Sequence, residues 1–439
     1  MMARASCYAI AAVLAVGIAA CGGGDSTKEQ IEDGPPVGKD APKVKVGWVK
    51  PRYQSTGGIA YCTDTTSAAR QESVDRFNAL YNRRGPSVRL IRMPTDTWGQ
   101  YDKFIKLRHE CDVFDADVIA TGALASKGLV YDTSAYVQPR RDEFVGNAVR
   151  TACYGARFWG VPHSTNVGLL FRTARGFEPV NWGEAYHSIA FQGRTDEALT
   201  VNFLELAVAA GGRVLAGNGN SAVLDDGDRN PNLRALRLMV DAVNNTTAKP
   251  QDGETATVRA FRRGEADYMR NWPAWYQRKY WTGRGVSRRH VRIAPLPLFE
   301  DAGVGAVLGG ANLVISTKSG NPQAALAFID YLTTVPEQKH GLAQFEPPAI
   351  DAAYEGAVPS FGRDLGDYAK EFVRELRRAV KQATPRPVVP GYRRISSAIA
   401  TNVGRALEGK ATPEEAIAEA NEQIDEIVRT APLVATCTG

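Results

Sequence analysis

Hydrophobic residues follow two different periods in the amino-terminal part of the chain. Val74, Phe77 and Tyr81 recur at helical spacing within residues 67–84, and a Gly-Pro pair ends that helix. The stretch 51–64 contains two adjacent glycines and is predicted to be a loop. Strands are predicted at 44–49, 88–93 and 113–119, and further helices at 101–108 and 123–129. This order predicts a mostly parallel sheet with helices on both faces.

The alternation of strands and helices continues to the end of the chain. Two strands joined by a turn are predicted within 158–172, and more strands at 266–270, 291–297 and 311–317. Helices are predicted at 181–189, 195–210, 233–243, 256–263 and 322–332. A last helix follows the capping box of Thr412 and Glu415. A chain of 439 residues is too long for one simple core, so we expect two α/β lobes.

The first residues have the pattern of an export signal. Arg4 precedes an apolar run that is shorter than the roughly 20 residues a bilayer requires. The run ends in Ile18-Ala19-Ala20-Cys21, which resembles a bacterial lipobox, so we expect a signal peptide at 1–20 and lipid on Cys21. An ordinary secretory signal with an incidental cysteine is the alternative. Residues 21–43 are glycine-rich and polar, and would be a flexible tether to the cell membrane.

The cysteines indicate two disulfides. Cys7 would leave with the signal peptide and Cys21 would carry the lipid, and four cysteines would remain. An exported chain lies in an oxidising compartment, where cysteines pair. Three pairings are possible and the sequence does not choose among them. The pairing preferred here joins Cys62 to Cys111 and Cys153 to Cys437, with the first bridge inside one lobe.

Composition and missing motifs exclude several functions. The net charge is +5 and arginines are scattered rather than clustered with aromatic residues, so no nucleic acid is expected as a partner. The sequence contains no CxxC, HExxH, GxxxxGK[ST] or GxSxG motif. Residues 226–237 begin like a calcium loop, but Pro231 replaces the required glycine and Arg237 the required glutamate. We therefore expect no metal and no cofactor, and we expect a monomer.

Six stretches together resemble the bacterial extracellular solute-binding proteins of family 1, the substrate-binding lipoproteins of carbohydrate ABC importers. The resemblance runs from about residue 44 to residue 427 and is strongest to the actinobacterial branch of trehalose- and maltose-type binders. The stretches are CDVFDADVIATGALASKGLVYDTS at 111–134, GVPHSTNVGLLFR at 160–172, LTVNFLELAVAAGGRVL at 199–215, FRRGEADYMRNWPAWY at 261–276, LGGANLVIS at 308–316 and PRPVVPGYRRIS at 385–396.

This resemblance implies a periplasmic-binding-protein-like α/β fold with a hinge between two lobes and the ligand in the cleft. It places 44–157 with about 305–350 in an N-terminal lobe, and 158–304 with about 351–439 in a C-terminal lobe. It also implies a function without catalysis, in which the chain captures a small carbohydrate and delivers it to permease subunits.

A sugar offers apolar ring faces and a belt of hydroxyls, so its site requires aromatic platforms together with amide, carboxylate and guanidinium groups. The stretch 269–277, MRNWPAWYQ, provides such groups, and Trp272 matches the family's ligand-facing aromatic. Packing inside a lobe is the alternative for its tryptophans, and a solvent or ion-pair position is the alternative for Glu205. The expected ligand-binding residues are Asp117, Thr121, Asn166, Glu205, Asn271, Trp272, Trp275, Tyr276, Gly310, Asn312 and Arg386.

One segment departs from the branch. An aromatic and an acid that lie near the ligand in these relatives are replaced by Ala120 and Ala123. A different sugar or a different pose is therefore expected. Either a larger ligand or the side chains of Asp96, Trp98 and Tyr101 would occupy the vacated room.

Two other functions compete with an importer subunit. A secreted glycoside hydrolase would need two carboxylates roughly 5 to 9.5 Å apart across the cleft. A sensor subunit would bind the same sugar but signal to a kinase. The sequence does not separate sensor from importer.

Overall fold

The computed structural model describes residues 58–430, except 65–67, 82–84, 174–176, 178, 180, 195, 218, 220, 228, 283, 300–304 and 357–364. The predicted signal peptide, lipidation site, tether and first strand (44–49) lie outside these residues, as does Cys437.

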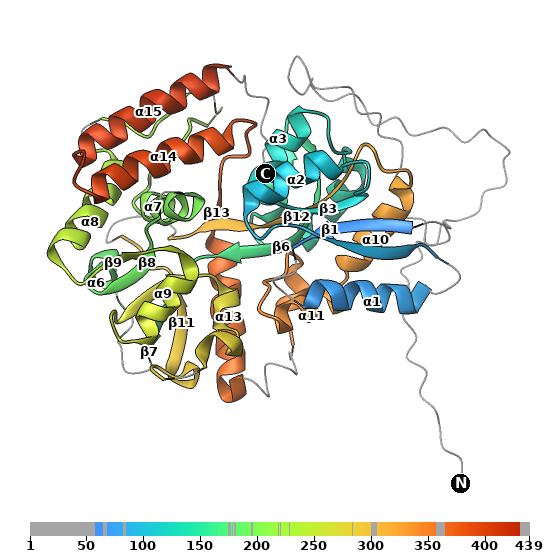
Figure 1. Ribbon diagram of the computed structural model, residues 1–439, viewed down its shortest axis with the longest axis horizontal. Coiled ribbons are helices and arrows are strands. Elements are labelled where there is room, and N and C mark those ends of the chain that lie inside the picture. Colours follow the sequence, from blue (N-terminus) through green and yellow to red (C-terminus); the bar gives the residue numbers. More distant parts are fainter. Residues whose placement is uncertain are drawn as a thin grey trace, which may run out of the picture. The chain divides into compact units, whose positions relative to one another are not determined.

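The first lobe is built on a six-stranded sheet of β1 (Gly58–Thr63), β2 (Ser87–Arg92), β3 (Val113–Asp117), β6 (Val161–Val167), β12 (Val307–Ile315) and β13 (Thr384–Pro385) (Figure 1). The order is β13-β12-β3-β1-β2, and β6 also pairs with β12. β1 is parallel to β2 and β3, whereas β12 is antiparallel to β3 and β6.

Helices and a short hairpin complete this lobe. The helices are α1 (Ala69–Tyr81), α2 (Thr97–Leu107), α3 (Thr121–Ser126), α4 (Ser134–Val137), α5 (Ala148–Thr151), α10 (Pro322–Leu332) and α11 (Val335–Ala343). The hairpin pairs β4 (Cys153–Tyr154) with β5 (Arg157–Phe158).

The prediction of a loop over 51–64 is wrong for its second part, because Gly58–Thr63 form an interior strand of the first sheet. Five of its six residues are buried, as expected for a parallel strand covered on both faces. The predicted disulfide between Cys62 and Cys111 is confirmed, with 5.9 Å between the Cα atoms. It ties β1 to the residue pair that precedes β3.

The second lobe contains a five-stranded sheet of β7 (Leu169–Thr173), β8 (Ile189–Gln192), β9 (Lys249–Gln251), β10 (Tyr268–Asn271) and β11 (Val291–Pro295), in the order β11-β7-β10-β8-β9. Its helices are α6 (Trp182–Tyr186), α7 (Glu197–Ala209), α8 (Pro231–Asn245), α9 (Gly253–Arg262), α13 (Ala369–Gln382), α14 (Tyr392–Leu407) and α15 (Pro413–Thr430). Figure 1 shows α14 and α15 side by side at the outer edge of this lobe.

Short 3₁₀ turns connect the longer elements. They are η1 (Val118–Ala120), η2 (Gln138–Glu143), η3 (Pro273–Tyr276), η4 (Arg278–Trp281), η5 (Arg288–His290), η6 (Asp351–Tyr354) and η7 (Gly366–Tyr368).

The chain passes directly from one sheet to the other at Gly168, between β6 and β7. A second passage joins β11 to β12. The first sheet takes β6 and β13 from the stretches 158–304 and 351–439, which the sequence assigned to the other lobe, because their backbone hydrogen bonds go to β12. Strands that belong to one sheet and continue into the other are the structural basis of a hinge.

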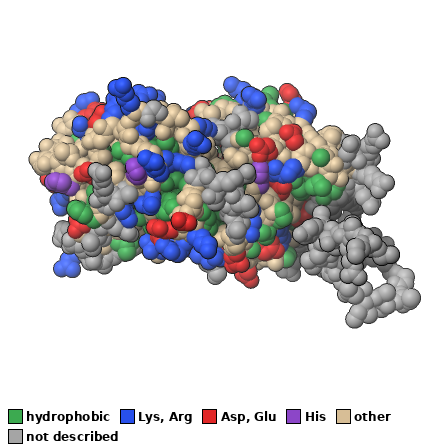
Figure 2. Space-filling model, turned by 90° about the horizontal axis from the view of Figure 1, so that it is seen from below, with side chains coloured by type: hydrophobic (Ala, Val, Ile, Leu, Met, Phe, Trp, Pro, Cys, Tyr) green, Lys and Arg blue, Asp and Glu red, His purple; other side chains and the backbone are tan. Residues whose placement is uncertain are grey.

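On the face shown in Figure 2, basic and acidic side chains are interspersed. Within the described part of the chain, no helix combines the length and apolar character that crossing a membrane requires.

Candidate functional site: a cleft between two lobes

A cleft of about 850 Å³ lies between the lobes. Its floor is made by the paired strands β6 and β12, where Asn166 faces Gly309 and Thr165 faces Gly310. Gly310 has a φ of +118°, and a Cβ atom there would lie 2.1 Å from the carbonyl oxygen of Ser164. Only glycine therefore lets these two strands approach so closely at the bottom of the cleft.

The first lobe lines the cleft with the start of α2 and the end of β3. Asp96 caps α2, and its carboxylate accepts a hydrogen bond of 2.6 Å from the backbone N–H of Gly99. Trp98 follows in the first turn and is half-buried in the cleft wall. Asp117 ends β3, and the hydroxyl of Thr97 donates to its carboxylate at 2.8 Å. This wall thus presents an indole beside two carboxylates.

The second lobe contributes the start of α7, the start of α9 and Trp272. Trp272 directly follows β10, and its indole Nε1 donates to the carboxylate of Glu254 at 3.3 Å. Glu197 lies in the first turn of α7, where a negative charge is favoured by the helix dipole. An indole and carboxylates therefore line this wall as well.

Arg386 connects the two walls. Its guanidinium contacts the carboxylate of Glu197 in the second lobe and lies 3.7 Å from that of Asp117 in the first. The hydroxyl of Tyr392 donates to the same Glu197 carboxylate at 2.9 Å. Burial raises the pKa of Glu197, and Arg386 only partly opposes that shift. The arginine is therefore an ionic bridge across the cleft floor.

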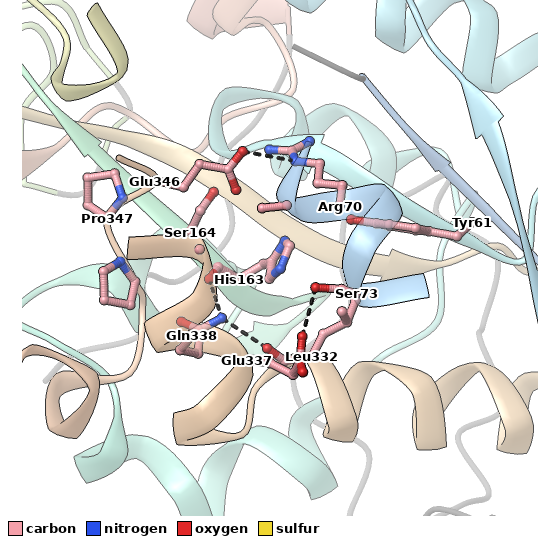
Figure 3. A pocket seen from close by; sticks show the side chains of 13 residues that line it. Tyr61, Arg70, Ser73, His163, Ser164, Leu332, Glu337, Gln338, Glu346 and Pro347 are labelled. Carbon is pink, nitrogen blue, oxygen red and sulfur yellow. Dashed lines mark hydrogen bonds and ion pairs between the residues drawn. The ribbon is translucent and has the colours of Figure 1, made fainter. Parts of the chain in front are cut away.

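A buried carboxylate, Asp115, underlies the first wall. Arg70 approaches it to 2.6 Å and the Nδ1 atom of His163 to 3.1 Å, and the hydroxyl of Tyr61 donates to it at 3.1 Å. Burial alone would raise the pKa of Asp115, but Arg70 and His163 outweigh burial and hold that pKa well below its ordinary value. Figure 3 shows Arg70, His163 and Glu346 around a small pocket, and Arg70 and Glu346 also line the cleft.

The cleft is rich in carboxylates. Among the described residues, eight carboxylates and three guanidinium groups line it. The acids are Asp64, Asp96, Asp115, Asp117, Asp196, Glu197, Glu254 and Glu346, and the arginines are Arg70, Arg194 and Arg386. Within the described residues, no group of three or more His, Cys, Asp or Glu side chains has a geometry suited to a metal ion.

Of the residues expected at the ligand, five line the cleft together: Asp117, Asn166, Trp272, Gly310 and Arg386. Six lie outside its lining: Thr121, Glu205, Asn271, Trp275, Tyr276 and Asn312. The spacing within a strand or helix places a side chain on a face, but the partners that bury it come from other elements.

Each of these six side chains has a structural partner. Asn312 donates to the Thr121 hydroxyl at 3.0 Å inside the first lobe. Asn271 is fully buried and accepts a hydrogen bond of 2.9 Å from the backbone N–H of Trp272. Glu205 pairs with Arg270, and Trp275 packs against Tyr280 in a tilted arrangement with 4.2 Å between ring centroids. The hydroxyl of Tyr276 donates to the Val291 carbonyl at 2.9 Å.

The two alanines that distinguish this chain from the trehalose- and maltose-type branch do not lie at the cleft, where they were expected. Ala120 and Ala123 are buried in the core of the first lobe and are not part of the cleft lining. Asp96 and Trp98 do line the cleft. Tyr101 is buried, and its hydroxyl accepts a hydrogen bond of 2.9 Å from Lys127.

Several cleft residues were missed by sequence reasoning, although local signals existed. Asp115 lies two residues before Asp117 on one strand, and this spacing puts both on the same face. Glu197 is an acid in the first turn of a predicted helix, and Glu254 lies two residues before the helix predicted at 256–263, in the first turn of α9. Arg70 gave no such signal, because its ion-pair partners lie directly after β1, on β3 and in the loop after α11.

Comparisons with known proteins agree with this architecture. Residues 63–339 match the family model described as bacterial extracellular solute-binding protein. A probable ABC transporter-binding protein of Deinococcus radiodurans is 23% identical over 84% of this chain and 93% of its own length.

Two solved structures share the fold. Maltose-bound T. maritima MalE3 has a TM-score of 0.72 and 24% identity, covering 84% of this chain and all of the other. The GacH receptor of Streptomyces glaucescens, solved unliganded and with acarbose, has a TM-score of 0.72 and 20% identity, covering 86% of this chain and all of its own. Because the family match covers more than half of the residues, this chain belongs to the bacterial extracellular solute-binding proteins.

Proposed function

We propose that the chain is the extracytoplasmic substrate-binding lipoprotein of an ABC importer, and that it captures a small uncharged saccharide by closure of its two lobes. The observation that carries this proposal is the pairing of Trp98 and Trp272 on opposite walls of a cleft rich in hydrogen-bond acceptors. Indole rings stack on the apolar faces of a sugar, and carboxylates accept hydrogen bonds from its hydroxyls. A disaccharide or short oligosaccharide of the maltose or trehalose type fits this chemistry.

The charge of the cleft restricts the ligand. Arg70 and Arg386 are already surrounded by carboxylates, so neither is free to neutralise an anionic ligand. A sugar acid or a sugar phosphate would add negative charge to an already acidic cleft, which is unfavourable in a partly desolvated site. A neutral or a cationic saccharide meets no such penalty.

The comparisons supply the transport part of the proposal. The relative from Deinococcus radiodurans is named as an ABC transporter-binding protein, and the two solved relatives hold maltose and acarbose. By analogy, the loaded protein would dock on permease subunits and release its sugar there.

A glycoside hydrolase is less well supported by the same site. The carboxylate with a raised pKa, Glu197, would be the candidate general acid. It is already engaged by Arg386, Tyr392 and Ser396, so it has little freedom to transfer a proton to a leaving group. A binding role does not need that freedom. A sensor subunit that signals to a kinase would use the same cleft, and a gene for a neighbouring permease would favour the importer.

Calorimetric titration of the mature protein tests the ligand class. Maltose, trehalose and maltotriose are the neutral probes, and glucuronic acid and glucose 6-phosphate are the anionic probes. We expect saturable binding of at least one neutral probe and at least tenfold weaker binding of both anionic probes. Binding of the anionic probes alone would contradict the proposal, as would hydrolysis of maltotriose in the same samples.

Membrane attachment has a separate test. Replacing Cys21 with serine removes the thiol that would carry the lipid, and we expect the variant to leave the membrane fraction and appear in the soluble fraction. Substitution of Ser26 by alanine is the control and should leave fractionation unchanged. A Cys21→Ser protein that stays as membrane-bound as the wild type would contradict the lipoprotein part of the proposal.

A further inference from the structure

The Trp272 ring packs against the buried guanidinium group of Arg270. The guanidinium carbon of Arg270 lies 3.9 Å from the centroid of the Trp272 ring, which is cation–π geometry. Arg270 is 1% exposed and does not line the cleft, whereas Trp272 does. Arg270 therefore covers one face of the indole, and the opposite face is the one available to a ligand.

Glu205 fixes this cation in place. Its two carboxylate oxygens accept hydrogen bonds of 2.7 and 2.5 Å from Nε and Nη2 of Arg270, a bidentate arrangement that sets the plane of the guanidinium. The third nitrogen, Nη1, donates to Gln192 at 3.0 Å. Glu205 is fully buried in α7, so the pair is shielded from water. The orientation of Arg270 is thus determined by partners on α7 and β8.

The same pair contacts the point where the chain passes between the sheets. The backbone N–H of Gly168 hydrogen-bonds to Glu205. A Cβ atom on residue 168 would lie 2.2 Å from Glu205 Oε1 and 2.7 Å from Arg270 Nη2. The space that a side chain would take is therefore filled by the ion pair, which packs directly against the connection between β6 and β7.

We propose that Glu205 and Arg270 are positioning residues for the ligand: they set the plane of the Trp272 indole and tie it to the inter-lobe connection at Gly168, without touching the ligand. This inference rests on the proposed saccharide cleft. Buried ion pairs are often replaceable by apolar residues without loss of stability. A bidentate pair directly beneath a cleft aromatic therefore fits a role in geometry better than a role in stability.

Two variants remove the pair in different ways. Glu205→Gln keeps the shape and an acceptor for Gly168 but removes the charge that holds Arg270. The double variant E205Q/R270M also removes the cation, which leaves no unpaired buried charge and protects the fold. Glu337→Gln is the matched control, because Glu337 forms a similar bidentate pair with Arg76 in the first lobe and does not line the cleft.

Two readouts are needed. The first is affinity for maltose, or for whichever neutral probe binds the wild type. The second is the indole N–H resonance of Trp272 in the unliganded protein, assigned through Trp272→Phe. We expect both Glu205 variants to bind at least tenfold more weakly and to displace the Trp272 resonance. Glu337→Gln should bind within twofold of the wild type and leave the resonance in place.

The outcomes separate this inference from the proposed function. If the wild type binds no saccharide but the Trp272 resonance moves in both Glu205 variants, the proposed ligand is wrong and the positioning role stands. If the wild type binds and both variants bind equally well with an unmoved resonance, the positioning role is overturned. A variant that loses affinity only in proportion to its unfolded fraction would also overturn it, because the pair would then be merely structural.

Discussion

The two walls of the cleft each rest on a buried carboxylate, and the two carboxylates are in opposite electrostatic situations. Asp115 in the first lobe has Arg70 and His163 as partners and a pKa held well below its ordinary value. Glu205 in the second lobe forms an ion pair with Arg270, and burial raises its pKa because Arg270 only partly compensates. Both side chains are almost completely excluded from solvent.

This difference shows that burial does not by itself decide whether the pKa of a carboxylate is raised or lowered. The partners also decide it: Asp115 faces Arg70, His163 and the hydroxyls of Tyr61 and Thr63, whereas Glu205 faces Arg270, which it shares with Gln192, and the backbone N–H of Gly168. A carboxylate stabilised as an anion contributes to folding at neutral pH, whereas one with a raised pKa costs stability there. We therefore expect Asp115 mainly to stabilise the fold and Glu205 mainly to orient Arg270.

The largest expected effect comes from removing the charge of Asp115. Asp115→Asn leaves Arg70 without its nearest counter-ion, and losing one partner of a buried pair costs about 3 to 5 kcal/mol of unfolding free energy. Glu205→Gln also leaves a buried guanidinium without its counter-ion, but it should cost less than Asp115→Asn, because burial already raises the pKa of Glu205 and removing its charge offsets part of the loss. Urea unfolding of both variants at pH 7 measures this contrast, and equal losses would refute it.

A smaller loss of unfolding free energy is expected from crowding the carboxylate of Glu205. Gly168→Ala places a methyl group within contact distance of Glu205 and Arg270, and overpacking of this kind costs about 1 to 3 kcal/mol. Affinity for the saccharide should fall with it, because the pair moves beneath Trp272. Gly217→Ala is the control, since a Cβ atom there would have no neighbour within 4 Å. If Gly168→Ala kept full wild-type affinity, the Glu205–Arg270 pair would not couple the β6–β7 connection to the ligand site.

The smallest effect is a difference in pH dependence. The folded-state pKa of Asp115 lies below its ordinary value of 3.8, so its contribution is complete above that pH and is lost as the pH falls further. The pKa of Glu205 lies above 4.5, so protonation favours the folded state and the wild type gains stability over Glu205→Gln as the pH falls from 7 towards 4.5. Unfolding free energies of the wild type, Asp115→Asn and Glu205→Gln at pH 7, 5.5, 4 and 3 should show these opposite trends. Parallel trends for the two variants would show that the two carboxylates have similar environments.

Sequence reasoning recovered most of the elements and the type of fold, because hydrophobic period and Gly-Pro stops are local signals. It missed β1, where adjacent glycines masked a buried apolar strand. Trp272 and Arg386, which it expected at the ligand, both line the cleft. Glu205 was expected at the ligand because a charged residue in an apolar helix must face solvent, an ion-pair partner or a cleft. Its partner Arg270 lies 65 residues away in the sequence, and no local pattern reveals it.

The most direct test of the account compares two tryptophans three residues apart. Trp272 lines the cleft with Arg270 against its ring, whereas Trp275 packs against Tyr280 outside the cleft lining. Titration calorimetry with the neutral saccharide that binds best should show Trp272→Ala weakened about tenfold to a hundredfold, since stacking and buried ring area each contribute and 1.4 kcal/mol is tenfold. Trp275→Ala should bind within about twofold of the wild type. Unchanged affinity in Trp272→Ala, with a large fall in melting temperature, would contradict the assignment of this cleft as a saccharide site.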